Sequence, residues 1–265
     1  MLPSSPRSAG PLPLTLRLLG PGGLWLGGEA LALPTRKALG LVAYLALEGP
    51  ASRSRLADLF WSENDEESAR RNLRRELHRL RETALRERLR ADEKAVGLEG
   101  PLEIDVARFQ ALLERGEAEA ALGVYRGPLL EGLELPGAAG FAEWLQGWRE
   151  QLDRQRQRAL LYRAENLETR GDWRGALEIH LRLLAEDSLQ ERHHREVMRL
   201  HYLLGEREAA LERFERLKGT LRQELGLEPL PETLHLVEQI RAARAPQPAP
   251  PAPQGPPPAL PLRPP

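Results

Sequence analysis

The chain has 265 residues, with 38 Lys and Arg, 39 Asp and Glu, and no cysteine. This length is enough for two domains with hydrophobic cores, and the lack of cysteine excludes disulfides, thiolate metal sites and a cysteine nucleophile. The formal net charge of −1 excludes a uniformly basic protein, but it does not exclude a local basic patch that could bind nucleic acid.

The two ends of the chain are rich in proline. Residues 1–12 are expected to form a disordered leader, and residues 245–265, which hold 11 of the 23 prolines, a disordered tail. No segment has the 18 consecutive apolar residues of a transmembrane helix, and the first residues lack the pattern of a secretory signal. We therefore expect a cytoplasmic protein without membrane contacts.

The first predicted elements are short strands followed by a helix. Apolar segments at 14–19, 24–26 and 30–33 are separated by glycine-rich turns, which predicts a small antiparallel meander. The apolar spacing then changes to three- and four-residue steps, which predicts a helix that begins near Pro34 and ends at Gly49.

Two more helices and a hairpin complete this domain. Ser52 is expected to cap a short helix, and a third helix is predicted over Glu66–Thr83. Extended segments follow over Leu85–Asp105. Strands, three helices and a hairpin in this order predict a winged helix-turn-helix domain over residues 13–105.

The predicted third helix concentrates positive charge. Between Ser68 and Arg90 there are nine Arg and three Glu. At 100° per residue, Leu73, Leu77 and Leu80 form a core-facing stripe, and the opposite side is basic. Such a helix suits the major groove of DNA, where Arg can pair with guanine and Asn with adenine, and Ser68 near the helix start can hold a phosphate.

Other basic residues lie at the starts of the two preceding helices and in the hairpin, where they are expected to contact the DNA backbone or minor groove. The expected DNA-binding set is Arg36, Lys37, Arg53, Arg55, Ser68, Arg71, Asn72, Arg74, Arg75, His78, Arg79, Arg88 and Arg90. Arg86 and Lys94 lie in the same predicted hairpin. Arg70 is expected to extend along the edge of the core, and Glu76 and Glu82 to pair with nearby arginines. The alternative that the residues leave open is that this charged face of the helix only contacts solvent and does not bind DNA.

The second half is almost entirely helical, and it repeats. Gly171–His180 and Gly205–Phe214 match at a spacing of 34 residues, the tetratricopeptide (TPR) period, and Gly116–Tyr125 is an earlier copy. In each copy the Gly should end one helix at a positive φ, and a small Ala should let two helices approach closely. This pattern predicts a TPR-like helical domain over residues 106–244.

No catalytic residues, cofactor or metal ligands are expected. His193 and His194 are adjacent, so on a helix they point about 100° apart, and no nearby pattern of acidic residues and His completes a metal site. His180 occupies the aromatic position of a repeat, where core packing is expected. Gly20–Gly23 lacks the following Lys and Ser or Thr of a phosphate-binding loop. These observations argue against an enzyme.

The order and spacing of several segments resemble the SARP-type bacterial transcriptional activators of antibiotic gene clusters, which join an OmpR-like winged helix to a bacterial transcriptional activation domain. The segments are Leu16–Gly20, Arg36–Leu39, Leu56–Trp61, Ala69–Leu73, Ile104–Phe109, Tyr125–Leu130, Glu191-Arg192 and Glu224–Pro229. The resemblance implies that the helix over Ser68–Thr83 is the recognition helix and that the hairpin over 84–105 is the wing.

The resemblance also implies a function. We expect a sequence-specific transcriptional activator that binds double-stranded promoter DNA, at direct repeats and as a homodimer, and that uses its helical domain for dimerisation or RNA polymerase contact. The alternative that the residues leave open is a TPR-like protein-interaction scaffold without specific DNA binding.

Overall fold

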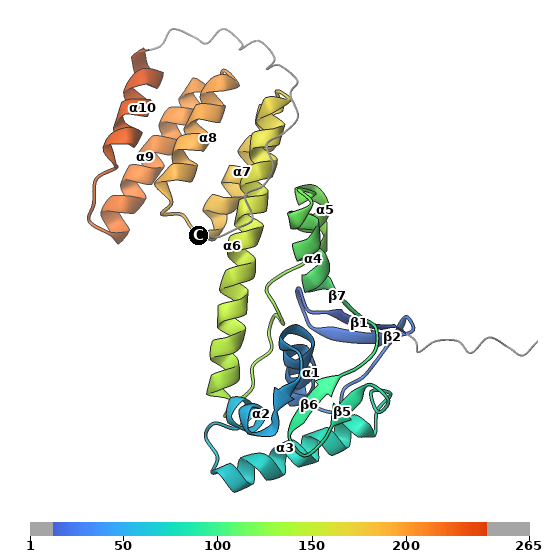
Figure 1. The fold of residues 1–265 in the computed structure, drawn as a ribbon. Helices are drawn as coiled ribbons and strands as arrows, with labels where there is room; N and C mark the ends of the chain where they lie inside the picture. The colour runs from blue at the N-terminus through green and yellow to red at the C-terminus, as the bar shows by residue number, and fades with distance from the viewer. Residues whose placement is uncertain (1–12, 243–265) are drawn as a thin grey trace, which may run out of the picture. The chain divides into compact units, whose positions relative to one another are not determined.

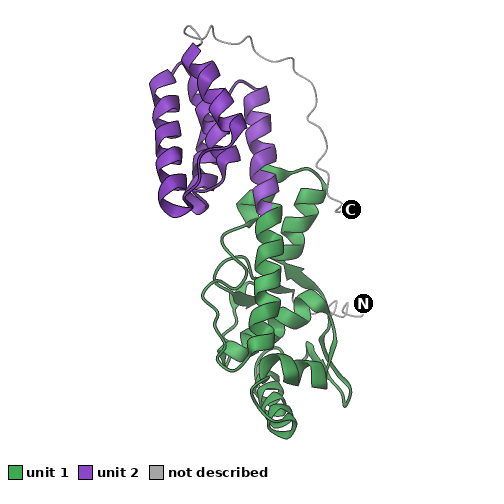
Figure 2. Cartoon of the chain, turned by 90° about the vertical axis from the view of Figure 1, so that its left-hand side faces the viewer, with its two compact units in different colours: residues 1–155 green, residues 156–265 purple. Residues whose placement is uncertain are grey.

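The computed structural model describes residues 13–242 (Figure 1). The predicted leader and the predicted proline-rich tail both lie outside the described residues. Contacts between Cα atoms divide the chain into two compact units, residues 1–155 and 156–265 (Figure 2). The long helix α6 (Ala139–Thr169) contributes to both units. The domain limits expected from the sequence, with a boundary at residue 105, stay a prediction.

The first unit contains two small sheets. In the first, neighbours are β3 (Glu29–Ala30), β2 (Gly23–Leu26), β1 (Leu14–Arg17) and β7 (Leu102–Ile104). In the second, they are β4 (Ala51–Ser52), β6 (Ala95–Leu98) and β5 (Leu89–Ala91). Strands β1, β2 and β3 pair antiparallel, so the predicted meander is confirmed.

The predicted hairpin over 84–105 is too long. Residues 84–88 form a turn, and only the β5–β6 pair makes the hairpin. Strand β7 instead pairs in parallel with β1, with Ile104 opposite Leu16. The chain changes sheets at Gly100, whose φ of +87° a residue with a side chain rarely adopts, and the Pro that follows cannot donate to the ladder.

Three helices lie between the strands of this unit: α1 (Arg36–Glu48), α2 (Arg53–Phe60) and α3 (Glu66–Arg81). The predicted Ser52 cap of α2 is confirmed, since its Oγ accepts a hydrogen bond from the Arg55 amide. Helix α3 begins at Glu66 as predicted, and Asp65 caps it by accepting from the Ser68 amide at 2.9 Å. This hydrogen bond lowers the pKa of the Asp65 carboxyl.

The rest of the first unit is formed by α4 (Asp105–Glu114), α5 (Ala118–Val124) and the first half of α6. Helix α6 docks on α1 through Glu48, whose Oε1 accepts from the indole Nε1 of Trp144 at 2.7 Å and of Trp148 at 2.8 Å. The Trp144 ring also lies 5.1 Å from that of Tyr44. Aromatic contacts of this kind add to the stability gained by burial.

The second unit pairs antiparallel helices: α7 (Trp173–Glu186), α8 (Glu191–Leu203), α9 (Arg207–Glu224) and α10 (Pro231–Ala242). Gly171 and Gly205 precede α7 and α9 with φ of +79° and +80°, as the repeat predicted. Ala176 and Ala210 are fully buried, which agrees with close helix approach.

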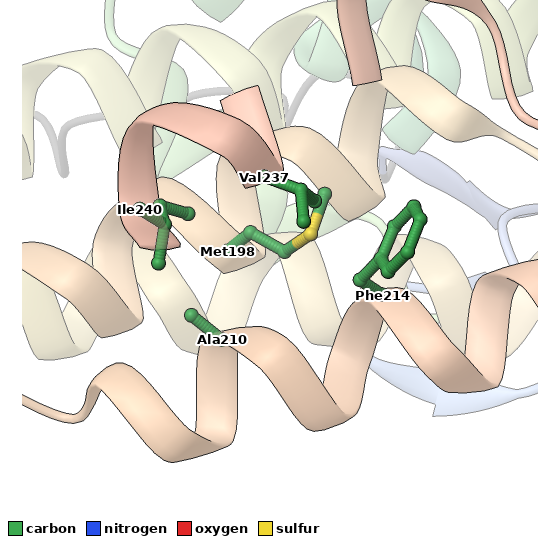
Figure 3. Close-up of a cluster of buried hydrophobic side chains, with 5 residues drawn as sticks. All are labelled: Met198, Ala210, Phe214, Val237 and Ile240. Carbon is green, nitrogen blue, oxygen red and sulfur yellow. The ribbon is translucent and has the colours of Figure 1, made fainter. Parts of the chain in front are cut away.

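The core of this repeat is apolar. Phe214 and Ala210 of α9 pack with Met198 of α8 and with Val237 and Ile240 of α10 (Figure 3). The predicted fold class, a winged helix-turn-helix followed by TPR-like helices, is thereby confirmed. No helix within residues 13–242 has both the length and the apolar character needed to cross a membrane.

Candidate nucleic-acid interface

Helix α3 has one buried face, which fixes its orientation. Leu73, Leu77 and Leu80 are at most 2% exposed, so the predicted core stripe is confirmed. Burial of each leucine contributes about 1.5–3 kcal/mol. Rotation of α3 about its axis would lose this contribution, and the opposite side chains therefore remain directed to solvent.

Glu76 attaches α3 to the start of α1. Its side chain is buried and accepts a hydrogen bond from the hydroxyl of Thr35, the residue that caps α1. Arg79 lies 3.4 Å from the other carboxylate oxygen, so the predicted pairing of Glu76 with an arginine is confirmed. A buried carboxylate with two partners holds the helix without leaving an unpaired charge.

The exposed side of α3 is basic. Its members are Arg71, Arg74, Arg75, His78 and Arg79, and we call them the basic face. Glu67 lies 3.1 Å from Arg71, and Glu82 lies 3.3 Å from His78 rather than beside an arginine as predicted. Exposed ion pairs of this kind contribute little, so a phosphate or a base can replace them. Between residues 13 and 242, no carboxylate forms an ion pair with Arg74 or Arg75.

Ser68 and Asn72 lie at the side of the basic face. Both are half-buried. The Asn72 Oδ1 accepts a hydrogen bond from the Arg75 guanidinium, which leaves the Asn72 amide nitrogen to donate. Their position agrees with the flank predicted from the helix periodicity.

A basic hollow lies between α2, α3 and the turn that joins β5 to β6. Its walls are Arg53, Ser54, Arg70, Leu73, Arg74, Glu93 and Lys94. Four of these side chains are cationic and one is acidic, so the hollow attracts anions. The Arg53 Nε donates to the Asp92 carbonyl at 2.6 Å, and this bond ties the hairpin turn to the start of α2.

Of the four cationic members of the hollow, only Arg70 was not expected to contact DNA. Arg70 was expected at the core edge, but its side chain is 56% exposed and pairs with Glu66 at 2.5 Å. The four-residue spacing of Arg70 and Arg74 places them on one side of α3, which was a usable signal. Lys94 was expected as a residue of the hairpin, and the hairpin turn places it beside Arg53 and Arg70.

Two predicted contact residues are instead held within the protein. Lys37 Nζ donates to the Phe60 carbonyl at 2.8 Å, and burial lowers the pKa of Lys37. Arg88 is only 5% exposed because its guanidinium folds against Gly100, where a Cβ would collide with it. We therefore leave Lys37 and Arg88 out of the candidate interface. The Arg36 guanidinium donates to the Gly132 carbonyl, but Arg36 is exposed and stays a predicted contact.

The remaining predicted residues, Arg55 and Arg90, are exposed. Arg55 lies in the first turn of α2, close to the hollow in sequence. Arg90 lies on β5 and pairs with Glu99 at 2.6 Å, which raises the pKa of its guanidinium. Together, the basic face and the hollow combine side chains suited to base edges with side chains suited to phosphates.

Comparison with known proteins identifies bacterial relatives of the chain. The family model described as bacterial transcriptional activator domain matches residues 104–241. The chain is 30% identical over 259 residues to the regulatory protein AfsR of Streptomyces griseus, with 91% of this chain and 26% of AfsR covered. The chain thus spans about a quarter of that relative's length.

A solved structure has a similar fold. Mycobacterium tuberculosis EmbR, determined in complex with a low affinity phosphopeptide, matches with a TM-score of 0.66 and 23% sequence identity. The match covers 86% of this chain and 65% of the EmbR chain. At this identity the likeness concerns the fold.

Proposed function

The chain belongs to the SARP-type bacterial transcriptional activators, which carry the bacterial transcriptional activator domain, and we propose that it binds promoter DNA sequence-specifically through α3. The observation that carries this proposal is the basic face, which is exposed on a helix whose other face is fixed in the core. A rigid helix can present Arg side chains to base edges at defined positions.

The proposal divides the basic residues into two roles. Arg71, Arg75 and His78 point away from the core and would enter the major groove, where Arg pairs bidentately with guanine. Arg53 and Lys94 in the hollow would hold a backbone phosphate at the side of the groove, which positions α3 but specifies no base.

We propose protein contacts for the helical unit, in a homodimer on direct repeats or with RNA polymerase. Four large apolar side chains are exposed around the α9–α10 connection: Leu225, Leu227, Leu230 and Leu234. Apolar surface concentrated in one segment is typical of an interaction site. Light scattering tests the dimer, since Leu227→Glu should convert a dimeric wild type to a monomer. A wild type that is monomeric both free and on DNA contradicts the dimer.

The DNA-binding experiment begins with selection of bound sequences from random oligonucleotides. Fluorescence anisotropy then measures the Kd for the selected duplex and for a scrambled duplex at two salt concentrations. Affinity should fall steeply with salt, because each neutralised phosphate releases counterions. Failure to enrich any sequence, with capture of a protein ligand, would favour the interaction scaffold instead.

Variants separate the two roles. Arg75→Ala should weaken the selected duplex about 5- to 150-fold, from a loss of about 1–3 kcal/mol, and weaken the scrambled duplex far less. Lys94→Ala should weaken both duplexes equally and reduce the salt slope by about one. Arg222→Ala, at an exposed position of α9, serves as the control and should change neither. Equal affinity of Arg75→Ala and wild type for the selected duplex refutes the proposed readout.

A further inference from the structure

Helices α6, α7 and α8 bring together a group of side chains that the DNA-binding proposal does not use. Glu168 of α6, His180 of α7 and Glu196 of α8 offer ligand atoms that all lie within 4.8 Å of one another. His193 of α8 joins them, since its Nδ1 lies 3.2 Å from the Nδ1 of His180. These residues are up to 28 positions apart in sequence, so only the packing of three helices creates the group.

The spacing of the two imidazoles matches that of two ligands on a tetrahedral metal ion. Zinc binds His nitrogen and carboxylate oxygen at about 2.0–2.2 Å, so two ligand atoms on one tetrahedron are about 3.3 Å apart. The two imidazole nitrogens already lie at nearly this distance. His180 is 4% exposed, so its ring is held by packing, and a site built on helices keeps its geometry better than one on loops.

Two carboxylates, those of Glu168 and Glu196, add negative charge beside the imidazole rings, and zinc also accepts carboxylate oxygen as a ligand.

Arg199 is the cation already present in the group. Its Nη2 lies 2.6 Å from the Oε2 of Glu168 and 2.7 Å from the Oε2 of Glu196. Each carboxylate has a second oxygen with free lone pairs, so contact with Arg199 does not consume it as a ligand. Hydrogen bonds to ligating carboxylates are common in metal sites, where they orient the ligand.

We propose that Glu168, His180, His193 and Glu196 form a binding site for a divalent first-row transition metal, with Zn²⁺ as the fitting ion. Arg199 acts as the positioning residue that holds the two carboxylates. Because the ligands come from α6, α7 and α8, the ion would join these helices and stabilise the second unit. The proposal is independent of DNA binding.

The test is calorimetric titration of the full chain, purified in the presence of a chelator and dialysed, with zinc sulfate. Wild type should bind one Zn²⁺ per chain and melt at a higher temperature when loaded. His193→Gln and Glu196→Gln should each weaken binding about tenfold or more. Both positions are partly exposed, so these variants should keep their circular dichroism spectra. His235→Gln is the matched control, an exposed histidine on α10.

A second readout uses Co²⁺, whose visible absorption is strong in tetrahedral sites and weak in octahedral ones. Wild type should show the strong spectrum and His193→Gln should lose it. Lack of saturable Zn²⁺ binding overturns the proposal and leaves the group as a polar contact among three helices. Binding that persists in His193→Gln and Glu196→Gln but disappears in His235→Gln overturns it too, because the ion then binds elsewhere.

Discussion

Replacement of His180 by Phe should make the second unit less sensitive to acid. The alignment of the repeats suggests Phe as the replacement. Phe214 occupies the position that matches His180 in the next repeat, and it is buried there. His180 is equally buried, so a ring of similar shape fits the site. What the variant removes is a group that can take up a proton.

The magnitude follows from the pKa of His180. Burial lowers it from 6.5 to about 4 in the folded protein; Glu196 opposes this shift, and His193, Arg199 and Arg192 add to it. Because the folded pKa is lower than the unfolded one, the unfolded chain binds the proton first as the pH falls. Stability is therefore fully present above about pH 6.5 and declines towards pH 4, with a loss of about 2 kcal/mol between pH 7.5 and pH 5.

The assay is urea unfolding at these two pH values, with a chelator present so that metal binding does not contribute. Circular dichroism at 222 nm follows the unfolding of the helices. Wild type should lose about 2 kcal/mol more than His180→Phe on acidification. An exposed control, His235→Phe, should behave like wild type.

An equal loss of unfolding free energy in wild type and His180→Phe would falsify the reasoning, because the burial of a neutral imidazole would then make no pH-dependent contribution to stability. A greater loss in the variant would contradict the sign as well.

Two further predictions concern the first unit. Asp105 is buried, and its carboxylate accepts hydrogen bonds from the amides of Leu18 and Leu19 at 2.8–3.0 Å. Urea titration of Asp105→Ala should show a free energy of unfolding lower by about 2–4 kcal/mol, because two buried amides lose their acceptor. The control Glu103→Ala, at an exposed position, should lower it by less than about 1 kcal/mol. Glu48→Ala removes the acceptor that two indoles on α6 share, so it should lower the free energy of unfolding by about 1–2 kcal/mol and shift the tryptophan emission. Unchanged emission and unchanged stability would show that this contact does not hold α6.

Much of the fold could be predicted because its signals are local. The leucine stripe of α3 follows from spacing alone, and Ser52 acts as a cap through a bond to a residue three positions later. Gly171 and Gly205 indicate where helices end, because a φ near +80° disfavours most other residues. Because the leucine stripe of α3 is buried, the basic face on the opposite side of the helix is exposed.

The surroundings of single side chains could not be predicted in this way. Periodicity assigned Arg88 to an exposed hairpin, but the space left by Gly100 allows its guanidinium to fold inward. Lys94 was expected only as a residue of the hairpin, and it lines the hollow with Arg53 and Arg70 because the hairpin turn is bonded to α2. Such contacts depend on residues distant in sequence.

The sequence by itself determined the elements, their order, the repeat and the amphipathic recognition helix, because these depend on short-range spacing and backbone preference. The tertiary structure decided which Arg and Lys side chains are exposed and which are held by contacts within the protein. It also decided that His193 faces His180, which in turn lies near Glu168 and Glu196. The spacing of residues along a helix predicts which way each side chain faces. The distance between side chains on different helices depends on how the helices pack.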